Sequence, residues 1–219
     1  AGRFEVERLA GSGGMARVYL ARDLSTGGPV ALKLLHEGAS PLHADRFVRE
    51  TDVLAGLTHP AIVRYVAHGL TERHQPFLAM EWLEGETLER RLKTGGIGAD
   101  ESVELVRRVA EGLGAAHASG FVHRDVKPSN LLLVDRDVRR VKILDFGIAH
   151  VMLGGPDAMT RTGTMLGTPG YMAPEQARGM RGVDARADVF SLGCVLFECL
   201  AARPPFFGEN FMAVLAKIL

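Results

Sequence analysis

HRDVKPSN, residues 123–130, is the most informative segment of this chain, together with the tripeptide DFG that begins at Asp145. Asp125 carries a carboxylate that can meet a hydroxyl nucleophile, and Lys127 carries an ammonium group that can meet a phosphate. Asn130 and Asp145 offer one amide oxygen and one carboxylate, which are hard ligands of the kind that Mg²⁺ accepts beside nucleotide phosphates. The two segments therefore predict a site for moving a phosphoryl group.

Several further motifs occur in a fixed order along nearly the whole chain, among them GSGGMARVY at 11–19 and GTPGYMAPEQA at 167–177. Together with HRDVKPSN and DFG they resemble the catalytic domain of eukaryotic-type protein kinases, and they are closest to its bacterial Ser/Thr branch. The resemblance implies transfer of the γ-phosphoryl group of ATP, with Mg²⁺, to Ser/Thr hydroxyls of protein substrates. It also implies an α+β, two-lobed fold with a small β-rich N-lobe at 1–83 and a mainly helical C-lobe at 84–219.

A glycine cluster separates the first two of three strands predicted from their apolar patterns, which lie around residues 4–9, at 18–20 and at 29–35. Because the chain continues as a strand after the glycines, a dinucleotide site, which needs a helix there, is disfavoured. Gly11, Gly13 and Gly14 would let backbone amides approach the ATP phosphates, although Ala16 replaces the third glycine of the family pattern. A plain hairpin turn is the alternative interpretation.

Lys33 matches the lysine that anchors phosphates in the family. It lies in an apolar run, so it needs an anionic partner. We expect that partner to be Glu50, on a helix over residues 47–57; a solvated Glu50 is the alternative. The competing acids are Glu37, Asp45 and Asp52.

Two more strands are predicted at 62–67 and 77–82. By the resemblance, the second ends at the gatekeeper Met80 and a hinge, where the Glu81 carbonyl and the Leu83 backbone hydrogen-bond adenine. The other residues that the resemblance places at the nucleotide are Val18, Ala31 and Leu132.

Between Asp100 and His117 the apolar residues recur at three- and four-residue spacing, which predicts a helix. Asp100 is the expected N-cap, and Gly120 is expected to end the helix. The apolar runs 131–133 and 141–144 predict a short strand pair that brings the two magnesium ligands, Asn130 and Asp145, to face each other.

Asp125 cannot be a strong base, since a free Asp has a pKa of about 3.9. The family's loose transition state needs positioning more than deprotonation, so Asp125 is expected to orient the hydroxyl and take its proton late. By the resemblance, Lys127 marks Ser/Thr specificity, and Thr168 bridges Asp125 and Lys127. His123 is interpreted as a structural residue stacked near Phe146.

Regulation is implied by Arg124, which marks kinases whose activation loop is ordered by a phosphate. The loop at 148–172 suggests trans-autophosphorylation within a homodimer, and an unmodified polar loop is the alternative. His150 stands where relatives commonly have Lys or Arg, so we expect the phosphate to hold the loop less firmly above pH 7. The candidate phosphorylation sites are Thr160, Thr162 and Thr164.

Composition limits the partners and the location. Lys+Arg and Asp+Glu both number 26, so there is no bulk basic field for nucleic acid or for an anionic membrane. Cys194 and Cys199 are expected to be buried thiols in a reducing, cytoplasmic compartment. The apolar stretch 189–202 is interpreted as a core helix because it is too short to cross a bilayer.

The chain begins with Ala, and its final helix at 211–219 has an apolar face that nothing later in the sequence covers. We therefore expect a C-lobe truncated at its C-terminal end. The chain is interpreted as part of a longer protein, and a membrane tether elsewhere in that longer protein is an open alternative. Three functions compete: an active kinase, a pseudokinase that binds nucleotide or a partner as a scaffold, and a naturally shortened regulatory protein. Lys33, Asp125, Asn130 and Asp145 argue against the second, and the third stays open.

Overall fold

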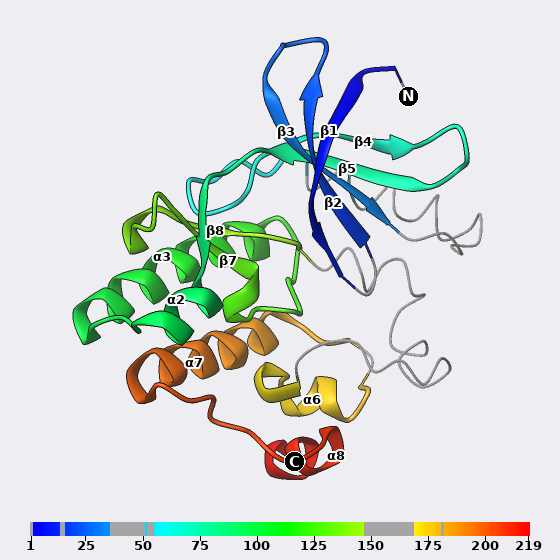
Figure 1. The fold of residues 1–219 in the computed structure, drawn as a ribbon. Helices are drawn as coiled ribbons and strands as arrows, with labels where there is room; N and C mark the ends of the chain where they lie inside the picture. Colours follow the sequence, from blue (N-terminus) through cyan, green and yellow to red (C-terminus); the bar gives the residue numbers. More distant parts are fainter. Residues whose placement is uncertain (1, 14–15, 36–50, 52–54, 147–168, 181) are drawn as a thin grey trace. The chain divides into compact units, whose positions relative to one another are not determined.

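The computed structural model describes residues 2–13, 16–35, 51, 55–146, 169–180 and 182–219 (Figure 1). The chain divides into two compact units. The first is built on residues up to Thr58 and on Val63–Leu83, and the second on His59–Ile62 and most of the chain from Glu84 onward.

The first unit is a five-stranded antiparallel sheet with the order β1-β2-β3-β5-β4. Its strands are β1 (Phe4–Ser12), β2 (Ala16–Asp23), β3 (Pro29–Leu35), β4 (Tyr65–Leu70) and β5 (Pro76–Glu81). One face carries the hydrophobic core, which consists of Ala21, Val30, Leu32 and Ala79 with partly buried aromatic and aliphatic side chains packed against it. β1 is an edge strand, and every residue in it after Phe4 is exposed.

The predicted strand at 62–67 is corrected by the structure, because β4 begins only at Tyr65. Ile62 instead forms a parallel bridge with Ile143 in the second unit. The Ile143 amide also donates to the Ala61 carbonyl at 2.7 Å. Ile62 is 1% exposed, so its apolar character reflects burial in the second unit rather than membership of the first sheet.

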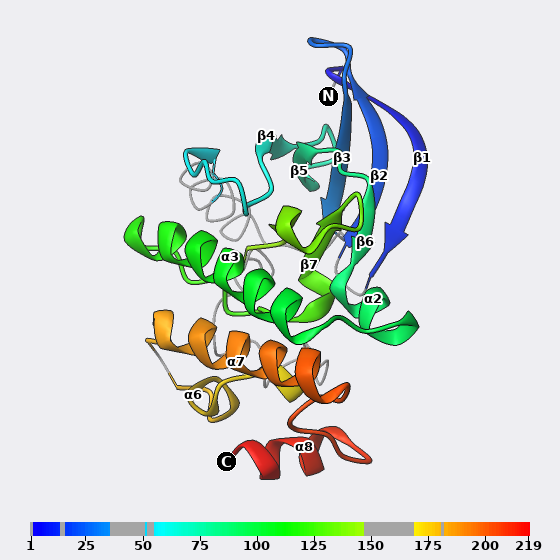
Figure 2. The ribbon, with the colours of Figure 1, turned by 90° about the vertical axis from the view of Figure 1, so that its left-hand side faces the viewer.

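The second unit combines a small sheet with helices. Its elements are β6 (Gly85–Thr87), α2 (Leu88–Thr94), α3 (Ala99–Ala118), η1 (Pro128–Asn130), β7 (Leu131–Val134), η2 (Val138–Arg140), β8 (Val141–Ile143), η3 (Pro169–Tyr171), α6 (Pro174–Ala177), α7 (Ala185–Ala201) and α8 (Phe211–Ile218). The sheet order is β6-β7-β8. α3 and α7 lie side by side (Figure 2). β7 and β8 are the strand pair predicted from the sequence.

β6 was not predicted, and a glycine makes it possible. A Cβ atom at Gly85 would lie 2.1 Å from the Leu133 carbonyl oxygen. Only a residue without a side chain therefore allows β6 to pair this closely with β7.

The N-cap of α3 lies two residues earlier than predicted. Gly98 is the N-cap, and its amide donates to the Glu101 carboxylate at 3.0 Å. Asp100 lies instead in the first helical turn, where its charge favours the helix dipole. Gly120, with φ of +81°, follows the C-cap Ser119 and ends the helix as predicted.

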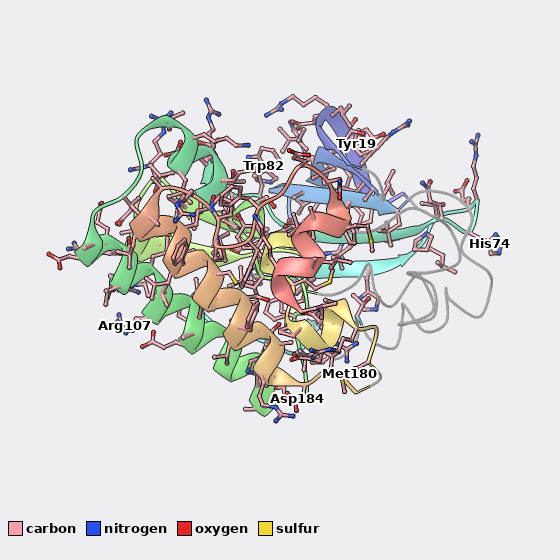
Figure 3. All side chains as sticks on the ribbon, turned by 90° about the horizontal axis from the view of Figure 1, so that it is seen from below. Tyr19, His74, Trp82, Arg107, Met180 and Asp184 are labelled. Carbon is pink, nitrogen blue, oxygen red and sulfur yellow. The ribbon has the colours of Figure 1, made fainter. Side chains whose placement is uncertain are left out.

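α7 is buried along one side only. Its N-cap is Asp184, whose side chain accepts from the Arg186 amide at 2.9 Å; Figure 3 labels Asp184, and Arg107 on α3. Cys194 and Cys199 are free and buried, as predicted, and burial raises the pKa of their thiols to about 11 and about 12. The exposed large apolar residues of α7 are Val189, Phe197 and Leu200.

The expectation that nothing covers the last helix is wrong for most of its apolar face. Val214, Leu215 and Ile218 of α8 are buried, and α8 packs against η3 and α6. Met212 and Leu219 remain exposed. No helix within the described ranges is long and apolar enough to span a membrane.

Candidate active site

Asp125 is held by its neighbours in HRDVKPSN. The Lys127 ammonium donates to both carboxylate oxygens of Asp125, at 2.9 and 2.8 Å. The Asn130 side-chain amide donates to the Asp125 carbonyl at 2.8 Å and to its Oδ2 at 3.0 Å. The side chain of Asp125 is 37% exposed. A partly exposed carboxylate is therefore fixed in direction and partly neutralised by one lysine, which suits a group that orients a hydroxyl.

The local backbone explains why these side chains meet. Pro128 opens the short 3-10 turn η1, where a missing amide hydrogen is tolerated. The Asn130 amide donates to the Lys127 carbonyl at 2.9 Å and closes that turn. Lys127 itself is extended, so its side chain and that of Asn130 both reach Asp125.

A buried carboxylate on α7 holds the backbone of the catalytic loop, residues 123–130. Asp188 is fully buried and accepts from the backbone amides of His123 and Arg124, at 2.8 and 2.7 Å. Its Oδ2 also lies 2.7 Å from Nε2 of His117 on α3. Three groups from α3 and the loop therefore converge on one side chain of α7.

Arg124 occupies the left-handed backbone region, with φ of +63°. This conformation is unfavourable for a residue with a side chain and persists only where surrounding contacts impose it. Asp188 supplies one such contact, and Gln176 of α6 supplies another by donating to the Arg124 carbonyl at 2.9 Å. The strain therefore falls on the residue directly before Asp125.

His123 is a packed residue, in agreement with its structural interpretation. It is fully buried, and its ring centroid lies 4.7 Å from that of Phe146. Its Nε2 contacts the Leu144 carbonyl at 2.8 Å, and its Nδ1 accepts from the Asp125 amide at 3.2 Å. Both ring nitrogens are thus committed to the backbone around the loop.

The β7–β8 pair brings the backbone at Asn130 next to the residue that precedes Asp145. Leu131 pairs with Ile143, and the Leu144 amide donates to the Asn130 carbonyl at 2.8 Å. The NH₂ group of Asn130 donates to Asp125. The side-chain amide oxygen of Asn130 is therefore the atom that could bind a cation. Asp145 has φ of +56°.

The donor set fits Mg²⁺ rather than a metal held by protein alone. An amide oxygen and a carboxylate are hard ligands, and Mg²⁺ usually takes its other ligands from water and phosphate. Within the described ranges, no group of three or more His, Cys, Asp or Glu residues could hold a metal ion. A cation at this place would therefore depend on phosphate oxygens.

In the first unit, strand pairing places four predicted nucleotide residues on one face. Val18 lies opposite Lys33 across β2 and β3, and Ala31 lies opposite Met80 across β3 and β5. Directly paired residues point to the same face of a sheet. The core cluster of this unit lies on the other face. Of these four residues only Met80 is buried, with 6% of its surface exposed.

The remaining predicted nucleotide residues are placed as follows. Gly11 pairs with Val18, and the Gly13 amide donates to the Ala16 carbonyl at 2.9 Å. Glu81 ends β5, and its carboxylate accepts from the Arg64 amide at 2.9 Å. Leu83 ends the segment Val63–Leu83 of the first unit, and Leu132 lies on β7 in the second.

Seven predicted residues lie outside the described residues: Gly14, Glu50, His150, Thr160, Thr162, Thr164 and Thr168. Arg124, the described member of the regulatory set, donates weakly to the Val183 carbonyl at 3.3 Å. Its Nε is buried and has no hydrogen-bond partner among the residues that the structure describes.

Sequence reasoning missed two parts of the site. Before the fold is known, nothing links His117 to Asp188, 71 residues away, or Gln176 to Arg124. The second part is Tyr171, whose hydroxyl donates to Glu198 of α7. Burial and this hydrogen bond raise the pKa of Tyr171 far above its ordinary value, so the hydroxyl remains a donor.

A cavity of about 360 Å³ adjoins the catalytic loop within the second unit. Lys127, Ser129, Tyr171, Glu89 and Glu198 are among the residues that line it. The lysine that contacts Asp125 therefore also lines this cavity.

Comparison with known proteins identifies the class that this fold and loop define. The sequence profile of the protein kinase domain matches residues 4–218, so the chain belongs to the protein kinase domain family. The expected kinase fold and the expected resemblance to bacterial Ser/Thr kinases are both confirmed.

Individual relatives are similar over almost the whole chain. Serine/threonine-protein kinase PknB of Mycolicibacterium smegmatis is 40% identical over 218 residues, which cover 97% of this chain and 34% of the relative. Serine/threonine-protein kinase pkn2 of Myxococcus xanthus is 41% identical over 222 residues, which cover 97% of this chain and 26% of the relative. The crystal structure of Rad53 1-466 in complex with AMP-PNP superimposes with a TM-score of 0.79 at 29% identity, covering 98% of this chain and 52% of that one. The chain thus spans about a third of the length of the PknB relatives.

Proposed function

We propose that the protein transfers the γ-phosphoryl group of ATP to Ser and Thr hydroxyls of protein substrates. The observation that carries this proposal is the arrangement of Asp125, Lys127 and Asn130, fixed to one another and tied through the loop backbone to Asp188. We further propose that residues 1–83 and 84–219 act as the N-lobe and C-lobe.

Asp125 acts mainly by orientation. Its carboxylate is directed by Lys127 and Asn130, so an incoming hydroxyl that donates to it is held in one direction. The proton passes to Asp125 late, as the bond from oxygen to phosphorus forms. The cavity beside Lys127 offers room for the peptide that carries this hydroxyl.

Lys127 supplies positive charge where charge accumulates on the transferred phosphoryl group. Its Nζ is 2.8 Å from Asp125 and its side chain is 16% exposed, so its charge is little screened by water. By the resemblance, this lysine and Thr168 belong to the Ser/Thr class.

By the resemblance, two sets of residues are proposed to bind Mg-ATP. Asn130 and Asp145 would hold the magnesium ion, which neutralises phosphate charge when bound. Lys33 with Glu50, and the backbone at Gly11, Gly13 and Gly14, would bind the phosphates. The proposed adenine contacts are Val18, Ala31, Met80, Glu81, Leu83 and Leu132.

Regulation by autophosphorylation is a further part of this proposal. The buried Nε of Arg124 is a donor that a phosphate could satisfy. The proposed acceptors are Thr160, Thr162 and Thr164, modified in trans within a homodimer, with His150 as a weaker, pH-dependent partner of the phosphate.

The test follows labelled phosphate. Purified protein is incubated with Mg²⁺ and ATP labelled at the γ or the α position, together with three peptides that differ only in a central Ser, Thr or Tyr. We expect γ label on the Ser and Thr peptides and none on the Tyr peptide. Nucleotide binding without transfer would instead support a scaffold function, and label on Tyr alone would contradict the Ser/Thr assignment.

A further inference from the structure

Arg8 of β1 and Trp82 after β5 contact each other within the first unit. The guanidinium carbon of Arg8 lies 5.6 Å from the centroid of the Trp82 ring, within the range of a cation–π interaction. The two residues are 74 positions apart (82 − 8). Trp82 is the only tryptophan of the chain and is labelled in Figure 3.

A β-bulge directs Arg8 to this contact. Val6 pairs with Ala21, yet Arg8, two residues on, pairs with the adjacent Leu20. Glu7 is therefore the extra residue of a bulge; in an unbroken ladder Glu7 would stand opposite Leu20. Bulges re-aim side chains in this way.

The bulge places Arg8 on the face that carries the predicted nucleotide residues. Arg8 pairs with Leu20, Leu20 with Ala31, and Ala31 with Met80, so one row of side chains runs across four strands. The position two residues after Met80 lies just beyond the end of β5, and the Arg8 guanidinium at the end of this row contacts it. That position is Trp82.

The backbone on either side of Trp82 is proposed to bind adenine. Glu81 and Leu83 are its two chain neighbours, so any contact that fixes the Trp82 side chain also restricts their backbone. β1 is an exposed edge strand, and the stack ties it to this segment through side chains rather than through the sheet ladder.

We propose that Arg8 is a positioning residue for nucleotide binding, which acts by stacking on Trp82 and so holding the backbone of residues 81–83 in place for the adenine base. The inference rests on the proposed function. A planar guanidinium suits this role better than an ammonium group, because it stacks on the indole face.

The direct test compares the nucleotide affinity of the parent protein with that of Arg8→Ala by calorimetry. A cation–π contact at an exposed site corresponds to a weakening of about two- to fivefold. Because the effect is exerted through the adenine-binding backbone, we expect the same weakening for adenosine and for Mg-ATP, with kcat unchanged. The nucleotide affinity of Arg8→Lys should lie between those of the parent and Arg8→Ala. Arg73→Ala, an exposed arginine in the β4–β5 turn, is the control and should bind as the parent does.

Two further measurements isolate the stack. Trp82 emission should shift in Arg8→Ala without any ligand, since the charge over the ring is removed. In a Trp82→Leu background, Arg8→Ala should cause no additional loss of affinity. Equal affinity of parent and Arg8→Ala would overturn the inference, and so would a weakening for Mg-ATP but not for adenosine, which would assign Arg8 to the phosphates.

Failure of the inference is distinguishable from failure of the proposed function. If the parent transfers phosphate and binds adenosine while Arg8→Ala does the same with equal affinity, only the inference fails. If the parent neither binds Mg-ATP nor transfers phosphate, the proposed function fails first.

Discussion

The catalytic loop and the first strand are built in opposite ways. The loop is tied by its backbone to a fully buried carboxylate, Asp188, and its side chains are hydrogen-bonded to one another. β1 is an exposed edge strand, interrupted by two register shifts and held on one side only. The two regions belong to different units, and each is proposed to serve one partner of the reaction.

This contrast indicates where the molecule needs rigidity. A group that orients a hydroxyl must be held to within a fraction of an ångström, and a buried hydrogen-bonded network achieves this. A strand with many exposed backbone groups and few buried contacts opens locally at low cost. We therefore expect single substitutions to be severe around Asp188 and mild along β1.

The largest effect is expected for Asp188→Ala. The change leaves the buried amides of His123 and Arg124 without an acceptor and removes the contact of His117. Breaking such a network costs about 3 kcal/mol or more of unfolding free energy, which urea denaturation measures. Asp184→Ala, at the exposed N-cap of the same helix, is the matched control and should lose far less. Comparable losses in the two variants would remove the basis of the comparison.

A small effect that depends on pH is expected at β1. Arg3, just before the strand, donates twice to Asp23 of β2 at 3.0 and 2.7 Å and holds the pKa of that carboxyl well below its ordinary value. A depressed pKa stabilises the folded protein above the unfolded pKa of about 3.9, and this stabilisation is lost as the pH falls towards the folded value.

Arg3→Ala should therefore lower the urea midpoint modestly at pH 7, and the gap to the parent should narrow as the solution is acidified below about pH 4. Arg22→Ala, which removes an exposed pair with Glu7, should show almost no gap at either pH. If the difference in urea midpoint between the parent and Arg3→Ala widened as the pH fell, the Arg3–Asp23 ion pair would not be the cause of the stabilisation.

The elements that repeat a simple pattern could be predicted from the sequence. β3 has its predicted bounds of Pro29–Leu35, and α3 departs from its predicted range by a residue or two. The meeting of Asp125, Lys127 and Asn130 follows from a short stretch of sequence and one tight turn.

What could not be predicted depends on contacts between distant segments. Ile62 looks like the start of a strand, but Ile143 draws it into the other unit. β6 has only three residues, and its position depends on the close approach of Gly85 to Leu133. The helix start at Gly98 was missed because a glycine cap uses its backbone, whereas Asp100 carries the expected side chain.

The decisive experiment for the proposed phosphoryl transfer measures the transfer rate of Asp125→Asn. The variant keeps the size of the side chain but loses the carboxylate that orients the hydroxyl and takes its proton. We predict that transfer to the Ser peptide falls by about a thousandfold, with unchanged Mg-ATP affinity and urea midpoint. Asp137→Asn, on the exposed turn that caps η2, should retain the parent rate. An Asp125→Asn protein that keeps more than about a tenth of the parent rate would contradict the proposed role of the catalytic loop.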